Sequence, residues 1–250
     1  MTNKTPWPII VLSLDGEDAR RAPLLERLAA LGLPFEVFIG IDGRKGFPPR
    51  WEAEIDRNAA LRQIGREMTD GEFACALSHR EIYRSILSKG WGGAVVLEDD
   101  AIIGQHFDAF IKQAIYDRSE LLMLDHSHAR VWRGSTEVLQ GVKMCRLSLS
   151  PSLATAYSIG RGAAEALVTA NKPVRNIADW PCDVTSLDAF ALVPQIVGHP
   201  DHDTGISHLR QERQKAAQAH RKSDIHKLVP LLTFTFWRHW FIKRLSRRVS

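Results

Sequence analysis

The sequence predicts one α/β domain with a mixed, mainly parallel sheet, followed by a basic amphipathic helix at the C-terminus. Apolar runs rich in β-branched residues alternate with segments of helical spacing, which is typical of α/β sheets. The chain has 250 residues, of which 44% are hydrophobic, and this suffices for one sizeable core. Its three cysteines are widely spaced and form no CxxC pair, so neither a disulfide framework nor a zinc site is expected.

The first elements follow from short, clear patterns. Residues 8–14 are an apolar run with β-branched side chains, which predicts a buried strand. In residues 20–32 leucines recur at helical spacing, and Gly32 followed by Pro34 predicts the end of that helix. Residues 35–43 predict a second strand that ends in an Asp-Gly pair. The chain therefore opens as strand, helix, strand.

A long helix is expected at residues 69–90. Thr69 and Glu72 have the spacing of a capping box, an apolar stripe follows, and Gly90 closes the segment. Residues 44–68 are weakly patterned and are expected to form a surface excursion. Further strands are expected at 92–100, 120–126, 142–149 and 153–160, and further helices at 107–116 and 162–170.

Three consecutive carboxylates stand where the predicted strand at 92–100 ends. Side chains alternate along a strand, so Glu98 and Asp100 are expected on one face and Asp99 on the other. Like charges at this spacing repel, and a divalent ion such as Mg²⁺ or Mn²⁺ takes oxygen ligands of this kind together with substrate phosphates. Ligands of α/β sheets bind beyond the carboxyl ends of strands. A metal–diphosphate site and a solvated strand end both remain open on this pattern alone.

Several blocks, in order, resemble glycosyltransferase family 25. The block MTDGEFACALSHREIYRSIL followed by VVLEDD is similar to the family's helix and acidic strand end. The opening strand and helix, the later ATAYSIGRGAAEAL and the segment ADWPCDV resemble further family blocks, so the likeness covers roughly residues 8–205. Ala74 stands where the family usually has glycine. The resemblance implies a GT-A fold and an inverting transfer of a galactose- or glucose-type hexose to a lipooligosaccharide or other cell-surface glycan.

The resemblance also assigns roles to particular residues. The acidic triplet matches the motif that holds a divalent metal, Mn²⁺ or Mg²⁺, and the nucleotide sugar, most simply a UDP-sugar. Asp179 is the expected general base, with Asp183 as its rival. Metal ligands are expected at Glu98, Asp100 and His199, with His202 as a further candidate. Residues expected to bind the donor are Leu14, Arg20, Arg21, Asp42, Ser78, His79, Glu98, Asp99 and Asp100.

Ordinary structural roles would also explain several of these residues, and two other functions are alternatives. Glu72 completes a capping box, a histidine inside a helix is usually structural, and Asp183 fits an exposed loop equally well. A sugar nucleotidyltransferase would need a glycine-rich phosphate loop after the first strand, where this chain has only Gly16. A non-catalytic, membrane-docked binding protein on the same fold is the other alternative.

The last 44 residues form a separate basic segment. Residues 207–250 hold 11 Lys and Arg against two acidic residues, whereas residues 1–206 hold 22 against 27. We therefore divide the chain into a catalytic domain at 1–206 and a tail at 207–250. Residues 226–250 are expected to form an amphipathic helix that docks on an anionic membrane surface, with a helix packed on the body, or a strand, as the alternatives. No recognisable nucleic-acid module is present, and the absence of a signal or transmembrane run predicts a cytoplasmic protein, peripheral on the inner membrane.

Overall fold

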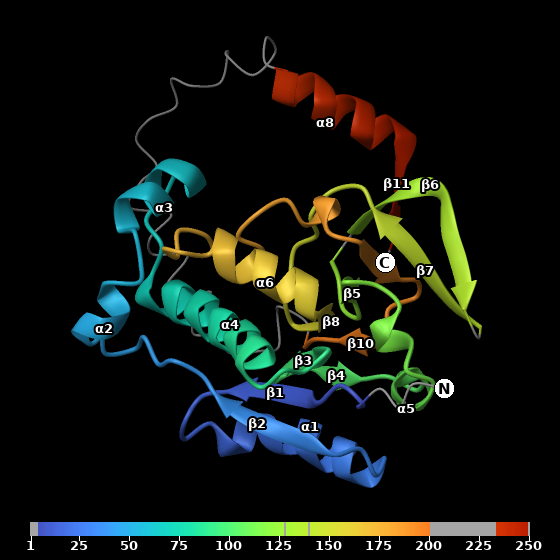
Figure 1. Cartoon of the computed structure of the whole chain (residues 1–250), viewed down its shortest axis with the longest axis horizontal. Coiled ribbons are helices and arrows are strands. Elements are labelled where there is room, and N and C mark those ends of the chain that lie inside the picture. The colour runs from blue at the N-terminus through green and yellow to red at the C-terminus, as the bar shows by residue number, and fades with distance from the viewer. Residues whose placement is uncertain (1–4, 128, 140, 201–233, 250) are drawn as a thin grey trace.

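The computed structural model describes residues 5–127, 129–139, 141–200 and 234–249. Within these residues nine strands form one mixed sheet, in the order β11-β6-β7-β9-β5-β8-β3-β1-β2, and β4 and β10 form a second, two-stranded sheet. Helices cover the main sheet, and Figure 1 shows α4 and α6 side by side. The fold class expected from the sequence, a mixed α/β sheet with helices, is confirmed.

The elements have the following bounds. The strands are β1 Ile9–Ser13, β2 Phe35–Ile39, β3 Gly93–Glu98, β4 Ile102–Ile103, β5 Leu121–Met123, β6 Ala129–Leu139, β7 Val142–Leu147, β8 Ala156–Gly160, β9 Ala189–Leu192, β10 Val197–Gly198 and β11 Ser246–Val249. The helices are α1 Asp18–Ala30, α2 Pro49–Glu52, α3 Arg57–Ile64, α4 Asp70–Ser88, α5 Phe107–Lys112, α6 Arg161–Ala170 and α8 Phe234–Leu245, with 3₁₀ turns η1 Ile115–Asp117 and η2 Val184–Ser186.

Parallel pairing is concentrated at the N-terminal end of the chain. β1 lies between β2 and β3 and pairs in parallel with both. The register sets Ser13 opposite Ile39 and Leu12 opposite Glu98, so these three strands end at the same edge of the sheet. β5 and β9 also pair in parallel, whereas the pairs with β8, β7, β6 and β11 are antiparallel. The shared edge of β1, β2 and β3 is where loops can gather polar side chains.

Helix α4 begins with the predicted capping box. The Thr69 hydroxyl accepts from the Glu72 N–H (3.2 Å), and the Glu72 carboxylate accepts from the Thr69 N–H (3.0 Å). Arg66 donates to both oxygens of the buried Glu72 carboxylate (2.6 and 2.7 Å), so the cap also carries an ion pair. The helix is buried along much of its length. Its start is therefore fixed at the sheet edge where β1 and β3 end.

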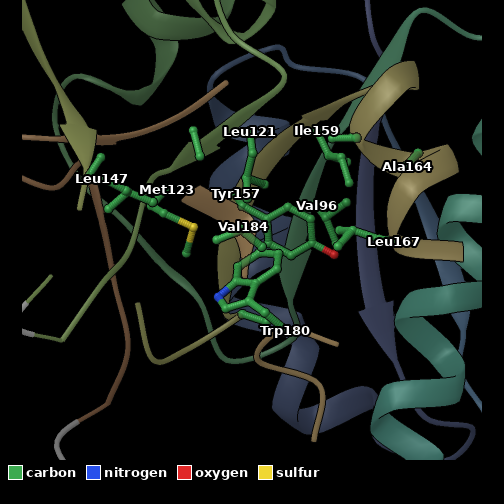
Figure 2. Packing of buried hydrophobic residues seen from close by; sticks show 14 of the residues in the cluster. Val96, Leu121, Met123, Leu147, Tyr157, Ile159, Ala164, Leu167, Trp180 and Val184 are labelled. Atoms are coloured by element: carbon green, nitrogen blue, oxygen red, sulfur yellow. The ribbon is translucent and has the colours of Figure 1, made fainter. Parts of the chain in front are cut away.

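Apolar residues fill both faces of the sheet. One cluster joins the sheet to α4 and α6 and includes Tyr157, which lies edge-on to Trp180 at a ring distance of 5.5 Å (Figure 2). The other cluster packs α1 and α5 against the opposite face, with Leu28, Phe107 and Phe110 buried. Tyr157 and Trp180 thus link the core to the segment around Asp179.

The structure corrects two expectations about elements. The weakly patterned residues 44–68 contain the short helices α2 and α3. The prediction of a single helix at 226–250 is wrong for the last residues. Helix α8 ends at Leu245, and Ser246–Val249 form the strand β11. β11 pairs antiparallel with β6, with Arg247 opposite Val131. Residues 226–233 lie outside the described residues. A strand that joins the main sheet ties the end of the tail to the body.

Candidate active site

A cavity of about 160 Å³ lies at the edge where β1, β2 and β3 end. The end of β1 with the loop after it, the start of α1, the loop after β2, the first three turns of α4 and the end of β3 contribute its walls. Its lining residues are Leu12, Ser13, Leu14, Glu17, Arg20, Ile41, Asp42, Gly43, Arg44, Gly71, Ala74, Cys75, Ser78, Glu98 and Asp99. Four carboxylates and two guanidinium groups therefore face one space, next to buried apolar side chains.

The positive group beside the acidic triplet is Arg20. Its Nε lies 2.9 Å from Asp99 Oδ1, and its Nη2 donates to Asp100 Oδ2 at 2.7 Å. Asp99 is buried and also accepts from the Ser13 hydroxyl (2.8 Å). Burial raises the pKa of Asp99, and Arg20 and Ser13 oppose that rise. A guanidinium group thus offsets the repulsion between these two carboxylates.

The alternation expected for the triplet is wrong. β3 ends at Glu98, and the N–H of Ala101 donates to the Glu98 carbonyl (3.0 Å), so Asp99 and Asp100 lie in a turn. Period-two alternation holds only while the strand continues. Glu98 and Asp99 line the cavity, and Asp100 is not among the lining residues.

Glu98 faces two residues of α4. Its Oε1 lies 3.2 Å from Nε2 of His79 and 3.9 Å from Sγ of Cys75. Nδ1 of His79 lies 2.7 Å from the hydroxyl of Tyr157, which donates to the hydroxyl of Tyr83 at 3.1 Å. Burial raises the pKa of Tyr157, so this phenol is neutral. A buried polar chain therefore runs from the core to the floor of the cavity.

Arg44, in the loop after β2, also lines the cavity and is held by two carboxylates. Its Nε and Nη2 donate to the Asp42 carboxylate (2.9–3.1 Å), and its Nη1 donates to Glu17 (2.7 Å). These hydrogen bonds lower the pKa of Asp42. Ser78 accepts from the N–H of Ile41 (2.8 Å) and donates to the Ala74 carbonyl. Ser78 therefore fastens the loop after β2 to α4 and sets the width of the cavity.

The residues expected to bind the donor divide into two groups. Leu14, Arg20, Asp42, Ser78, Glu98 and Asp99 line the cavity. Arg21, His79 and Asp100 are outside the lining: Arg21 donates to the Leu14 carbonyl (3.2 Å), His79 lies behind Glu98, and Asp100 is held by Arg20. The donor-binding role of all nine residues stays a prediction.

The two candidate general bases flank Trp180: Asp179 directly precedes it, and Asp183 follows it by three residues. Asp183 caps η2, where its Oδ1 accepts from the N–H and hydroxyl of Thr185 (3.1 and 2.7 Å) and from Ser150 (3.2 Å). Asp179 is half-buried and precedes Trp180, which packs on Tyr157. The local hydrogen bonds thus give Asp183 a structural task.

The three metal ligands expected from the sequence do not form a group close enough to share one ion. Nδ1 of His199 lies 2.7 Å from Oδ2 of Asp125, a fully buried carboxylate at the end of β5. Among the described residues, the group of His, Cys, Asp and Glu side chains close enough to share an ion is Cys75, His79 and Glu98. His202 lies outside the described residues. The set Glu98, Asp100 and His199 therefore does not fit one metal ion in this arrangement.

Sequence reasoning missed Arg44, Cys75 and Asp125. Cys75 and His79 are four positions apart on a helix, a spacing that places two side chains on one face. That spacing was available in the sequence. Asp125 ends a short apolar strand, which is also a recognisable pattern. Their partners, Glu98 and His199, come from distant segments, and only the fold brings them near.

The structure thus defines a mixed α/β protein with a polar, acid-rich cavity at the carboxyl ends of its parallel strands. Residues 7–185 match the family model described as glycosyltransferase family 25 (LPS biosynthesis protein). This match covers well over half of the chain. The chain belongs to glycosyltransferase family 25.

Individual relatives are distant. The chain is 24% identical over 230 residues to a "Putative glycosyltransferase" of Haemophilus influenzae, covering 86% of this chain and 79% of the relative. It is 25% identical over 103 residues to the lipooligosaccharide biosynthesis protein lic2B of Haemophilus influenzae, covering 41% of this chain and 37% of that protein. It is 27% identical to the "Probable inactive glycosyltransferase 25 family member 3" of Rattus norvegicus over 44% of this chain and 20% of the relative.

Among solved structures, the chain is similar to "Crystal Structure of A197 from STIV". The sequence identity is 11% and the TM-score is 0.38, and the match covers 82% of this chain and 99% of the other.

Proposed function

We propose that this protein transfers a galactose- or glucose-type hexose from a nucleotide sugar to a hydroxyl group of a lipooligosaccharide or other cell-surface glycan, with inversion at the anomeric carbon. Family membership supports a glycosyltransferase. The observation that carries the choice of site is the cavity at the strand ends, where Arg20 and Arg44 face carboxylates beside apolar side chains. Ligands of α/β sheets bind at such an edge.

The charges of the cavity suit the two ends of a nucleotide sugar. Arg20 and Arg44 supply planar guanidinium groups, which pair well with phosphate oxygens. Glu17, Asp42 and Glu98 supply carboxylate oxygens, which accept hydrogen bonds from ribose and sugar hydroxyls. UDP-sugars are the donors we expect first. As the glycosidic bond breaks, the guanidinium groups stabilise the charge that develops on the departing diphosphate.

Dependence on Mn²⁺ or Mg²⁺ is part of the proposal. The lining carries four carboxylates against two guanidinium groups, so an anionic diphosphate gains from entering with a cation. Such an ion needs only one or two protein carboxylates when phosphates complete its shell. The candidates are Glu98, which lines the cavity, and Asp100, which lies in the adjoining turn and pairs with Arg20. When bound, the ion would neutralise phosphate charge. Nδ1 of the predicted third ligand, His199, lies 2.7 Å from Asp125, and His199 does not join Glu98 and Asp100 in a group close enough to share an ion.

The acceptor hydroxyl needs a base, and Asp179 remains our candidate. An inverting transfer proceeds by direct attack of the hydroxyl on the anomeric carbon, so it needs no enzyme nucleophile. A carboxylate near the acceptor removes the hydroxyl proton during that attack. Asp179 is preferred because the likeness to family 25 places the general base at this position, and Asp183, which caps η2, stays its rival.

A donor panel tests the proposed reaction. The full chain is incubated with UDP-, GDP- and other nucleotide sugars, with and without Mn²⁺, and release of the nucleoside diphosphate is measured. One donor should be hydrolysed slowly, and faster when a glycan acceptor with a free hydroxyl is added. Nucleotide binding without release of the nucleoside diphosphate would favour the non-catalytic alternative. The name of the rat relative contains the word "inactive", so this alternative is worth testing. Release of pyrophosphate from a sugar phosphate and a nucleoside triphosphate would favour a nucleotidyltransferase.

We also propose that α8 docks on an anionic membrane surface at the cytoplasmic face of the inner membrane. Trp237, Trp240, Phe241 and Leu245 are exposed, with fractions between 41% and 58%. Arg244 lies over the ring of Trp240 at 5.2 Å, and Lys243, Arg247 and Arg248, which lie close to it in the sequence, are exposed. Aromatic side chains beside basic ones suit the headgroup region. Among the described residues, the helices are too short or too polar to span a bilayer.

Vesicle sedimentation tests this docking. The double variant Trp237→Glu/Phe241→Glu keeps β11 and its pairing with β6, which a deletion of the tail would remove. It should lose salt-sensitive binding to vesicles that contain anionic lipid, while its melting temperature stays that of the wild type. Val138→Glu, on an equally exposed residue of β6 (65%), is the matched control and should bind normally. Equal binding by the double variant would contradict the docking.

A further inference from the structure

Three potential metal-binding side chains meet at the floor of the cavity. Sγ of Cys75, Nε2 of His79 and Oε1 of Glu98 all lie within 4.8 Å of one another. Cys75 and His79 stand one helical turn apart on α4, and Glu98 is the last residue of β3. We propose that these three residues bind a thiolate-preferring transition metal of the zinc type in the absence of the donor, with Oε1 of Glu98 as the carboxylate ligand.

The distances suit tetrahedral coordination. Zinc lies about 2.3 Å from sulfur and about 2.0–2.2 Å from imidazole nitrogen or carboxylate oxygen. Tetrahedral angles then place the nitrogen roughly 3.4 Å and the sulfur roughly 3.6 Å from the carboxylate oxygen. The observed separations are 3.2 Å between His79 and Glu98 and 3.9 Å between Cys75 and Glu98. These two separations are within a few tenths of an ångström of the tetrahedral values, and Sγ of Cys75 and Nε2 of His79 lie within 4.8 Å of each other.

The hydrogen bonds behind His79 prepare it as a ligand. The hydroxyl of Tyr157 donates to Tyr83, so it can accept from an Nδ1–H of His79 at 2.7 Å. In that tautomer, Nε2 has no proton and its lone pair faces the Glu98 carboxylate at 3.2 Å. Two acceptors at this distance repel unless a proton or a cation lies between them. The Tyr157 hydroxyl, which lies on the far side of the His79 ring from Glu98, is the kind of outer partner that orients most metal-binding histidines.

The ligand types and the access route indicate the kind of ion. Thiolate and imidazole together favour zinc over Mn²⁺ or Mg²⁺, which prefer oxygen ligands. Cys75 and Glu98 line the cavity, whereas His79 lies behind them. An ion would therefore enter through the cavity and keep its fourth position open to it, as catalytic zinc sites do. Cysteine spacing alone predicts no zinc site, because two ligands here are not cysteines and one comes from a distant strand.

Cobalt titration tests this site without any donor. Metal-free full-length protein is titrated with Co²⁺, which reports a thiolate ligand through a near-ultraviolet charge-transfer band. The wild type should bind one Co²⁺ per chain with this band, and Zn²⁺ should displace it while Mg²⁺ does not. Cys75→Ser should lose the band. Tyr157→Phe, which removes only the outer partner of His79, should weaken binding about 10–100-fold.

Cys182→Ser is the matched control, because Cys182 is also a half-buried reduced cysteine and should not affect the band. Circular dichroism of each variant checks that it is folded. A folded wild type without the band overturns the proposal even if a variant fails to fold. A band that survives in Cys75→Ser, or disappears in Cys182→Ser, also overturns it. Because no nucleotide sugar is present, the result is independent of the proposed transfer reaction.

Discussion

Replacing Arg20 with methionine tests the claim that a guanidinium group holds the acidic triplet together. Methionine keeps most of the length of the side chain and removes its charge. Arg20 lies 2.9 Å from Asp99 and 2.7 Å from Asp100. Without Arg20, the carboxylates of Asp99 and Asp100 lose the guanidinium group that pairs with both of them beside Glu98.

The expected loss of stability lies between two known limits. Removing one partner of a buried ion pair costs about 3–5 kcal/mol, whereas exposed pairs contribute about 0–1 kcal/mol. The Arg20 side chain is 40% exposed and that of Asp99 is 8% exposed, so solvent screens one end only. We expect Arg20→Met to lower the free energy of unfolding by about 1–2 kcal/mol, or roughly 2–8 °C in melting temperature for a chain of this size.

The deficit should depend on pH in a defined direction. Burial already raises the pKa of Asp99, and Arg20 opposes that rise, so the pKa should climb further in Arg20→Met. The stability that Arg20 contributes is present while Asp99 is ionised and disappears as the pH falls through its folded-state pKa. Thermal melts at about pH 7 and about pH 5 should therefore show a larger difference from the wild type at the higher pH.

Arg118→Met is the control for removal of an arginine. Arg118 is 52% exposed and lies 3.9 Å from Asp117, so its loss should change stability by less than about 0.5 kcal/mol. If Arg20→Met melts like the wild type at neutral pH, Arg20 does not hold the triplet. A deficit that stays constant on acidification would likewise refute the electrostatic explanation.

Two further pairs of substitutions probe the proposed base and the shape of the cavity. Asp179→Asn should reduce transfer about 10²–10⁴-fold and leave donor affinity unchanged, whereas Asp183→Asn should leave transfer and stability largely unchanged, because asparagine caps a helix about as well as aspartate; the opposite pattern in rate assays would move the base to Asp183. Gly43→Ala should cost about 1–3 kcal/mol in urea unfolding, since its Cβ would clash with the Asp70 carbonyl oxygen, whereas Gly198→Ala meets nothing within 4 Å and should be neutral. Equal stability of these two alanine variants would contradict the close packing at Gly43.

Local patterns predicted the elements that depend on nearby residues. The capping box of Thr69 and Glu72 placed the start of α4 correctly, because both of its hydrogen bonds form within one turn. The run at 8–14 predicted β1 for a similar reason. The strand β11 was missed, because Ser246–Val249 has a polar sequence and is a strand only through its pairing with β6.

The candidate site was predictable as a location but not in its internal arrangement. An acidic cluster after an apolar run indicated a strand end, and Glu98 and Asp99 do line the cavity. The faces of the triplet were wrong because the turn at Asp99 interrupts the alternation. The partnership of Asp99 with Arg20, and of His199 with Asp125, depends on contacts across about 70–80 residues. Sequence spacing carries no information about such contacts.

The central claim is that the cavity at the ends of β1, β2 and β3 binds a nucleotide sugar for transfer. The most direct measurement is equilibrium titration of the wild type and Arg44→Met with the donor that the panel identifies. Arg44 lines the cavity, and a charge-assisted hydrogen bond to phosphate contributes about 1.5–3 kcal/mol. The account predicts roughly 10–100-fold weaker donor binding by a folded Arg44→Met variant. Equal affinity of the two proteins, or no binding of any nucleotide sugar by the wild type, would contradict it.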